Sequence, residues 1–150
     1  MRRGVSVAID AGGRRIGVAR CDSDRILALP VATVTTDRYG GHLDELVDII
    51  AELDAVDIFV GLPAHLSGAE GASAQAARRF AKALRNRIGL PIRMVDERLT
   101  TVQAHAHLSE AGRSTRNRRS VIDQASAVVL LEHVLEAERR TGEIPGQLVK

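Results

Sequence analysis

The chain has 150 residues, of which 45% are hydrophobic and 27% are charged, and its formal net charge is +2. This length and balance are typical of one globular domain with its own core, and they exclude a disordered chain. A single cysteine excludes an intramolecular disulfide, and no apolar run is long enough for a membrane span or a signal peptide. We therefore expect a cytoplasmic protein with one domain over residues 1–150, comprising a core at about 4–140 and a C-terminal tail at 141–150.

Hydrophobic periodicity predicts a run of strands followed by alternating helices and strands. A buried strand, a glycine turn and two further strand-like stretches suggest an antiparallel meander. Two helices, each with one apolar face, then alternate with two short apolar strands, and a capping-box spacing at Thr100 predicts a third helix. Ser120 is expected to cap a last helix that ends near Arg140. The predicted segments, in chain order, are VSVAI, RIGVARCD, ALPVATVTT, LDELVDIIAEL, VDIFVGLP, the apolar stripe from Ala77 to Ile88, LPIRMVDE, TVQAHAHLSEA and the helix from Ser120. This order predicts an α/β fold with a mixed five-stranded sheet, an antiparallel meander followed by parallel strands, flanked by helices.

Three acids fall at positions that such a fold could bring together. Asp10 ends the first strand, and Asp96 and Glu97 end the last one, at the edge where α/β sheets bind ligands. Side-chain alternation sends Asp96 and Glu97 to opposite faces, so at most one of them can join Asp10. Asp123 stands at the head of the core-facing stripe of the last helix. A carboxylate there is costly unless it is paired, hydrogen-bonded or bound to metal.

Each acid also has a purely structural interpretation. Asp10 could accept hydrogen bonds from the glycine turn, Asp123 could satisfy amides at a helix start, and Glu97 could pair with a nearby arginine. Taken together, however, the three could form one site, and clustered carboxylates suit Mg²⁺ or Mn²⁺, with room for two ions. A zinc site is not expected, because His105 and His107 face different directions on a helix and no cysteine pair exists.

Basic residues cluster in the segments RRFAKALRNR and GRSTRNRRS, which suggests contact with a nucleic acid. Solvated arginine is the alternative for both segments. Aromatic residues make up only 2% of the chain, so we expect contacts with the nucleic-acid backbone rather than with stacked bases. The glycine hairpin and the loop after the fourth strand add three candidates, for which an ordinary surface role is the alternative. The candidate nucleic-acid-binding residues are Arg14, Arg15, His65, Arg113, Arg116, Arg118 and Arg119.

Four motifs resemble, in order and spacing, the bacterial family of pre-16S ribosomal RNA nucleases. Members of this family are also described as Holliday-junction-resolvase-like proteins of the RNase H superfamily. The motifs are IDAGGRRIGVA, VGLPAHLSG, VDERLTT and RRSVIDQASA, within a match from about Val5 to Leu135. The resemblance implies an RNase H-like fold and a divalent-metal phosphodiesterase, with Asp10, Glu97 and Asp123 as catalytic and metal-binding acids. Ala11 and Ser126 depart from the proline and alanine common in the family, and neither change removes a ligand.

The resemblance ranks three functions. Trimming of the 16S ribosomal RNA precursor comes first, resolution of four-way DNA junctions by a dimer comes second, and non-catalytic nucleic-acid binding comes third. A monomer or a weak homodimer is expected, because the sequence shows no coiled-coil stripe. The hairpin also resembles the phosphate hairpin of actin-like and sugar-kinase ATPases, but the chain is too short for the second hairpin and second domain that those enzymes need.

Overall fold

The computed structural model describes residues 1–63, 71–96 and 115–150. Most predicted segments appear as strands or helices within a residue or two of their expected bounds. The elements are β1 (Ser6–Ala11), β2 (Arg15–Cys21), β3 (Ala28–Thr35), α1 (Gly41–Glu52), β4 (Asp57–Leu62), α2 (Ala72–Arg85), β5 (Ile92–Asp96), α4 (Thr115–Thr141) and β6 (Gln147–Leu148). The helix predicted from Thr100 lies outside the described residues.

The strands form one mixed sheet in the order β3-β2-β1-β4-β5-β6. The pairs β1–β2 and β2–β3 are antiparallel, whereas β1–β4 and β4–β5 are parallel. The predicted meander followed by parallel strands is therefore confirmed. The sheet has six strands rather than the expected five, because the C-terminal tail adds β6 antiparallel to β5. Gly146 has a φ of +95°, and a Cβ there would lie 2.7 Å from the Met94 carbonyl oxygen, so glycine allows the tail to approach β5.

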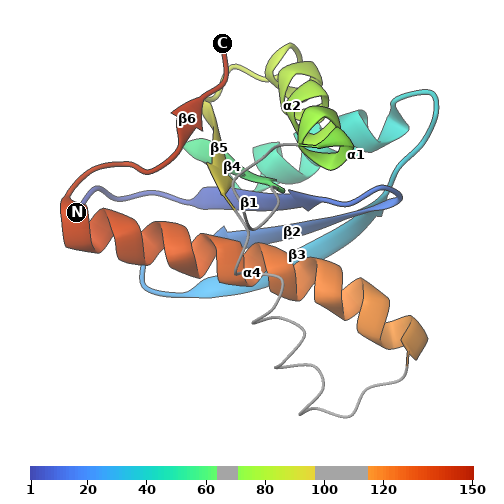
Figure 1. The fold of residues 1–150 in the computed structure, drawn as a ribbon. Helices are drawn as coiled ribbons and strands as arrows, with labels where there is room; N and C mark the ends of the chain where they lie inside the picture. The colour runs from blue at the N-terminus through green and yellow to red at the C-terminus, as the bar shows by residue number, and fades with distance from the viewer. Residues whose placement is uncertain (64–70, 97–114) are drawn as a thin grey trace.

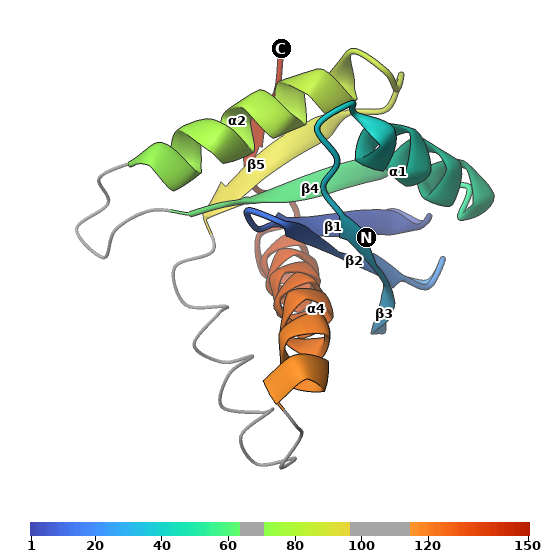
Figure 2. The ribbon, with the colours of Figure 1, turned by 90° about the vertical axis from the view of Figure 1, so that its right-hand side faces the viewer.

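Helices cover both faces of the sheet (Figures 1 and 2). Helices α1 and α2 pack on one face and α4 packs on the other, where it crosses β1, β2 and β3. Side chains alternate along β1, so Ile9 joins the core under α1 and α2 while Ala8 joins the core under α4. The predicted apolar faces of α1 and α2 are buried, and their fully or nearly fully buried residues are Leu43, Leu46, Ile50, Ala77, Ala81 and Leu84.

The start of the last helix corrects a prediction. Helix α4 begins at Thr115 rather than at Ser120, so part of the arginine-rich segment is helical instead of a break. Arginine has a high helix propensity, so an arginine-rich segment can extend the helix without an apolar pattern of its own. The predicted stripe downstream is confirmed, because Ala127, Leu130 and Leu131 are buried against the sheet. Within the described residues, no helix has the length and apolarity needed to cross a membrane.

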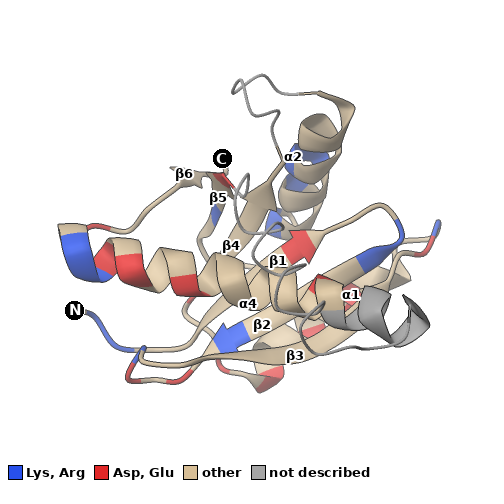
Figure 3. Cartoon of the chain, turned by 60° about the horizontal axis from the view of Figure 1, so that its bottom comes forward, with Lys and Arg blue, Asp and Glu red and all other residues tan. Residues whose placement is uncertain are grey.

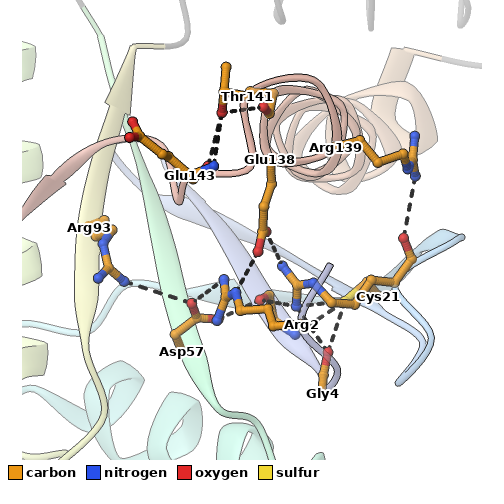
Figure 4. Close-up of polar contacts among 12 residues, drawn as sticks. Arg2, Gly4, Cys21, Asp57, Arg93, Glu138, Arg139, Thr141 and Glu143 are labelled. Carbon is orange, nitrogen blue, oxygen red and sulfur yellow. Dashed lines mark hydrogen bonds and ion pairs between the residues drawn. The ribbon is translucent and has the colours of Figure 1, made fainter.

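An ion-pair network that the sequence did not predict ties the end of α4 to the start of the sheet (Figure 4). The Arg25 side chain is completely buried and donates a hydrogen bond of 2.7 Å to Glu138. Arg2 donates a hydrogen bond of 2.6 Å to the other Glu138 oxygen and forms an ion pair with Asp57. Ser6 donates a hydrogen bond to Asp57 and accepts one from Arg25. These charges are tolerated in the interior because each one has an opposite partner.

Candidate active site

The site begins with Asp10 near the carboxyl end of β1. Ala8, two residues earlier, packs on the α4 side of the sheet, so strand alternation directs the Asp10 side chain to the same side. Asp10 lies directly opposite Gly17 of the antiparallel neighbour β2. The glycine hairpin that joins the two strands leaves the Asp10 position half-buried at the edge of the molecule.

Helix α4 contacts the sheet at that same glycine. A Cβ on Gly17 would lie 1.8 Å from the backbone oxygen of Asp123 and 2.9 Å from the amide nitrogen of Gln124. Only glycine permits this approach, because any side chain would overlap the helix backbone. Gln124 also donates a hydrogen bond of 3.0 Å to Thr33 on β3, which fixes the helix across the meander. Asp123 is thereby held over the residue that faces Asp10.

The carboxylate of Asp123 is paired with a cation. Arg15, the first residue of β2, donates a hydrogen bond of 2.7 Å from Nε to Asp123 Oδ2. The Asp123 side chain is 16% exposed, so the pair is accessible from solvent at one edge. Figure 3 shows acidic colouring at the arrowhead of β1 and basic colouring in the adjoining hairpin. The site therefore already holds a positive charge against one of its acids.

Some of the remaining predicted site residues lie within the described part of the chain and others do not. Glu97 directly follows β5, but Glu97, His65 and Arg113 lie outside the described residues. Arg116, Arg118 and Arg119 fall in the first turns of α4, upstream of Asp123 on the same helix. Arg14 is exposed in the hairpin. Among the described residues, no three histidine, cysteine or acidic side chains form a metal-binding group. A metal site at Asp10 and Asp123 would therefore also need Glu97, the predicted acid that follows β5.

From the sequence alone, no role was assigned to two residues near the site, Gly17 and Ser126. Gly17 stands in the middle of an alternating strand, and an interior glycine of that kind is the recognised sign of a close backbone approach. Ser126 is one turn from Asp123 and 2% exposed, and its hydroxyl has no hydrogen-bond partner among the described residues. The serine that departs from the family's usual alanine thus buries an unsatisfied polar atom.

Comparison with known proteins identifies the family. Residues 4–137 match the model of the RuvX family, described as "Holliday junction resolvase". A protein of Thermobifida fusca named "Putative pre-16S rRNA nuclease" is 52% identical, over 100% of this chain and 98% of its own length. A Streptomyces coelicolor protein of the same name is 46% identical, over 100% of this chain and 90% of its own.

Among solved structures, RuvC of T. thermophilus in complex with a Holliday junction substrate aligns with a TM-score of 0.57 and 14% identity. The alignment covers 97% of this chain and 99% of RuvC. At this sequence identity the structural similarity shows only the fold, and it confirms the predicted RNase H-like architecture. The family match and the full-length relatives confirm the predicted kinship and the class of enzyme, a hydrolase of phosphodiester bonds. This chain belongs to the RuvX family of nucleases.

Proposed function

We propose that this protein is a divalent-metal-dependent nuclease that trims the precursor of 16S ribosomal RNA. The observation that carries the proposal is that the α4 backbone at Asp123 lies against Gly17, which is the residue directly opposite Asp10 in the sheet. Two carboxylates brought to one edge of a sheet need a cation to offset their repulsion, and phosphodiester hydrolysis by two metal ions uses such a site. The name shared by the full-length relatives supports the choice of RNA substrate.

The residues present fit Mg²⁺ or Mn²⁺. Both described ligands are carboxylates, which are hard oxygen donors, and Arg15 shows that a cation is accommodated at Asp123 Oδ2. Glu97 is proposed as the third ligand, from its place after β5. When bound, a pair of ions would activate the attacking water and stabilise the leaving oxygen.

The remaining roles belong to side chains around the acids. Asp10 and Asp123 are proposed to hold the metal, and Gly17 sets their separation by admitting the α4 backbone. Arg15 neutralises Asp123 in the metal-free protein and is positioned beside the acids to contact a substrate phosphate. Phosphate contacts are also proposed for the other basic candidates and for the loop histidine. These are Arg14, His65, Arg113, Arg116, Arg118 and Arg119.

The proposal is tested with purified protein and two labelled substrates, a 16S precursor RNA and a four-way DNA junction. Each is incubated with Mg²⁺, with Mn²⁺ or with EDTA. We expect cleavage of the precursor RNA with either metal and none in EDTA. Cleavage that persists in EDTA contradicts the metal mechanism, and an intact precursor beside a resolved junction contradicts the choice of substrate.

A second candidate function is resolution of four-way junctions, which is favoured by the description of the matched family. One chain carries one set of three acids, whereas resolution requires two symmetric cuts and therefore two chains related by a two-fold axis. We propose a monomer or a weak homodimer in the cytoplasm, which suffices for trimming an RNA end. Light scattering over a concentration series measures the oligomeric state, and a cleavage assay on the junction shows whether opposite strands are nicked together. A tight dimer that nicks both strands together would favour resolution.

A further inference from the structure

A cavity of about 430 Å³ opens on the other side of the β1–β2 hairpin from Asp123. Its wall includes Asp10 and the hairpin glycines Gly12 and Gly13, so the cavity and the candidate active site share one hairpin. Ile16 and Leu43 form part of its apolar floor. Its volume falls within the range of about 300–1,000 Å³ that is typical of sites for small organic groups.

Helix α2 presents a separate stripe of residues to this cavity. The buried stripe of α2 packs on the sheet, whereas a neighbouring stripe with the same three-and-four spacing faces the opening. This cavity stripe consists of Ser73, Ala76, Phe80 and Ala83. Three of its residues are small, so Phe80 supplies the one large flat surface among them. The helix is therefore shaped to leave space beside an aromatic ring.

The distribution of aromatic residues points to the same place. The chain has one tyrosine, two phenylalanines and no tryptophan. Phe59 is buried in the core under α4, so it cannot meet a ligand. Phe80 lines the cavity, and Tyr39, which is 86% exposed, lies in the loop between two further lining residues, Thr36 and His42. Phe80, which is partly buried against the core, thus lines the cavity that adjoins Asp10, and Tyr39 lies in the chain segment between two of its lining residues.

Polar groups at the rim add hydrogen-bonding capacity. The Nδ1 atom of His42 accepts a hydrogen bond of 3.1 Å from the amide of Asp37. In the neutral ring the proton is therefore on Nε2, which makes that atom a donor. The Arg38 guanidinium lies 5.8 Å from the centre of the Tyr39 ring, so a cation accompanies the exposed aromatic side chain. A flat, polar-edged group next to a phosphate is the ligand that such surroundings fit.

We propose that this cavity binds an unpaired base of the substrate RNA strand, adjacent to the phosphate that lies at Asp10 and Asp123. The inference rests on the proposed nuclease function and adds a site of base recognition to it. It also revises the expectation that contacts would be confined to the backbone, because Phe80 lines the cavity and offers a ring on which one base can stack. Single-stranded RNA offers bases free to enter such a site, whereas a paired base would first have to leave its stack.

Binding of abasic RNA tests the proposal without requiring cleavage. Fluorescence anisotropy in EDTA is measured with a labelled oligoribonucleotide that spans the cleavage position, and with a series that lacks one base at each position in turn. For the wild type we expect one position, next to the cleaved phosphate, at which loss of the base weakens binding about tenfold. Phe80→Leu and Ala76→Leu should weaken binding of the intact strand by a similar factor and abolish the penalty at that position.

Two controls separate the possible outcomes. Gln75→Leu adds the same apolar side chain to an exposed position of α2 outside the cavity lining, and it should leave binding unchanged. Ala76 is exposed, so Ala76→Leu fills the cavity without altering the core if Phe80→Leu destabilises the fold. Equal binding across the abasic series, a penalty that persists in both variants, or no measurable binding of the strand would overturn the proposal. Absence of metal-dependent cleavage counts instead against the nuclease function.

Discussion

Substituting Gly17 with alanine should change the candidate active site without removing or adding any charged group. The added Cβ would lie 1.8 Å from the Asp123 backbone oxygen, whereas real contacts of this kind are almost never closer than 3.0 Å. Helix α4 and β2 must therefore separate locally by roughly 1 Å or more. Because Asp123 is the residue in contact, the displacement acts directly on the distance between the two described acids.

The size of the effect follows from this overlap. Forcing an extra methyl group into a packed contact costs about 1–3 kcal/mol of the free energy of unfolding. A displacement of about 1 Å at a catalytic group can lower turnover roughly a hundredfold. We therefore expect Gly17→Ala to remain folded, with a lowered melting temperature, and to lose most of its kcat on precursor RNA. Its KM should change less, because the substrate contacts outside the acids remain.

The assay compares steady-state cleavage and denaturant unfolding for the wild type, Gly17→Ala and Gly89→Ala. Gly89 lies between α2 and β5, and no atom of the described residues is within 4 Å of the Cβ position there, so its variant controls for the added methyl group. Wild-type kcat and stability in Gly17→Ala would refute the role assigned to the close contact. A loss of stability with unchanged kcat would show that the contact supports packing alone.

Four further outcomes are expected. Replacing any one of the three candidate acids by its amide should abolish cleavage at saturating Mg²⁺ in a gel assay while circular dichroism shows a retained fold; the variants are Asp10→Asn, Glu97→Gln and Asp123→Asn. Arg15→Gln should lower the free energy of unfolding of the metal-free protein by about 1 kcal/mol. It should also lower the Mg²⁺ concentration for half-maximal thermal stabilisation, and an unchanged midpoint would contradict competition between Arg15 and metal. Ser126→Ala should raise the free energy of unfolding by about 1 kcal/mol, because no described residue is a hydrogen-bond partner of the buried hydroxyl, and urea titration measures the change. Burial raises the pKa of Glu138, but hydrogen bonds and attraction from Arg2 and Arg25 outweigh it, so the pKa lies below its ordinary value of 4.5. The stability that the ionised Glu138 contributes is therefore present above its ordinary pKa and is lost as pH falls through the lowered pKa. Glu138→Gln should flatten the fall in the free energy of unfolding on the acid side. Parallel curves of unfolding free energy against pH for the wild type and the variant would contradict this role of Glu138.

The sequence predicted the sheet and the helix faces because both depend on local periodicity. Strands buried on both faces are continuous apolar runs, and the core stripes of α1 and α2 recur at the helical period. The shared site of Asp10 and Asp123 stays a prediction; what the structure adds is the approach of the α4 backbone at Asp123 to Gly17, the register partner of Asp10. The glycine that makes this approach possible was not recognised, because its role depends on a helix more than 100 residues away.

Local patterns also failed where side chains make long-range contacts. Arg25 has an ordinary loop sequence around it, yet its backbone is left-handed with a φ of 61° and its side chain is fully buried. It is buried because Glu138, from the far end of the chain, supplies a partner. Strand β6 was not predicted for a similar reason, since its two residues are specified by pairing with β5 rather than by any apolar pattern.

The two ends of α4 have different tasks, and their separation explains where the charges lie. Asp123 and Glu138 are 15 positions apart, which corresponds to about 22 Å along a helix. Figure 3 shows acidic and basic residues along the C-terminal turns, where the ion-pair network anchors the helix. Anchoring the helix there places Arg2 and Arg25 at the opposite end of α4 from Asp123, beyond the reach of a direct ion pair with that candidate metal ligand. At the end that carries the candidate acid Asp123, the helix is instead held by an uncharged contact at Gly17, and Arg15 is the cation that a bound metal would have to replace there.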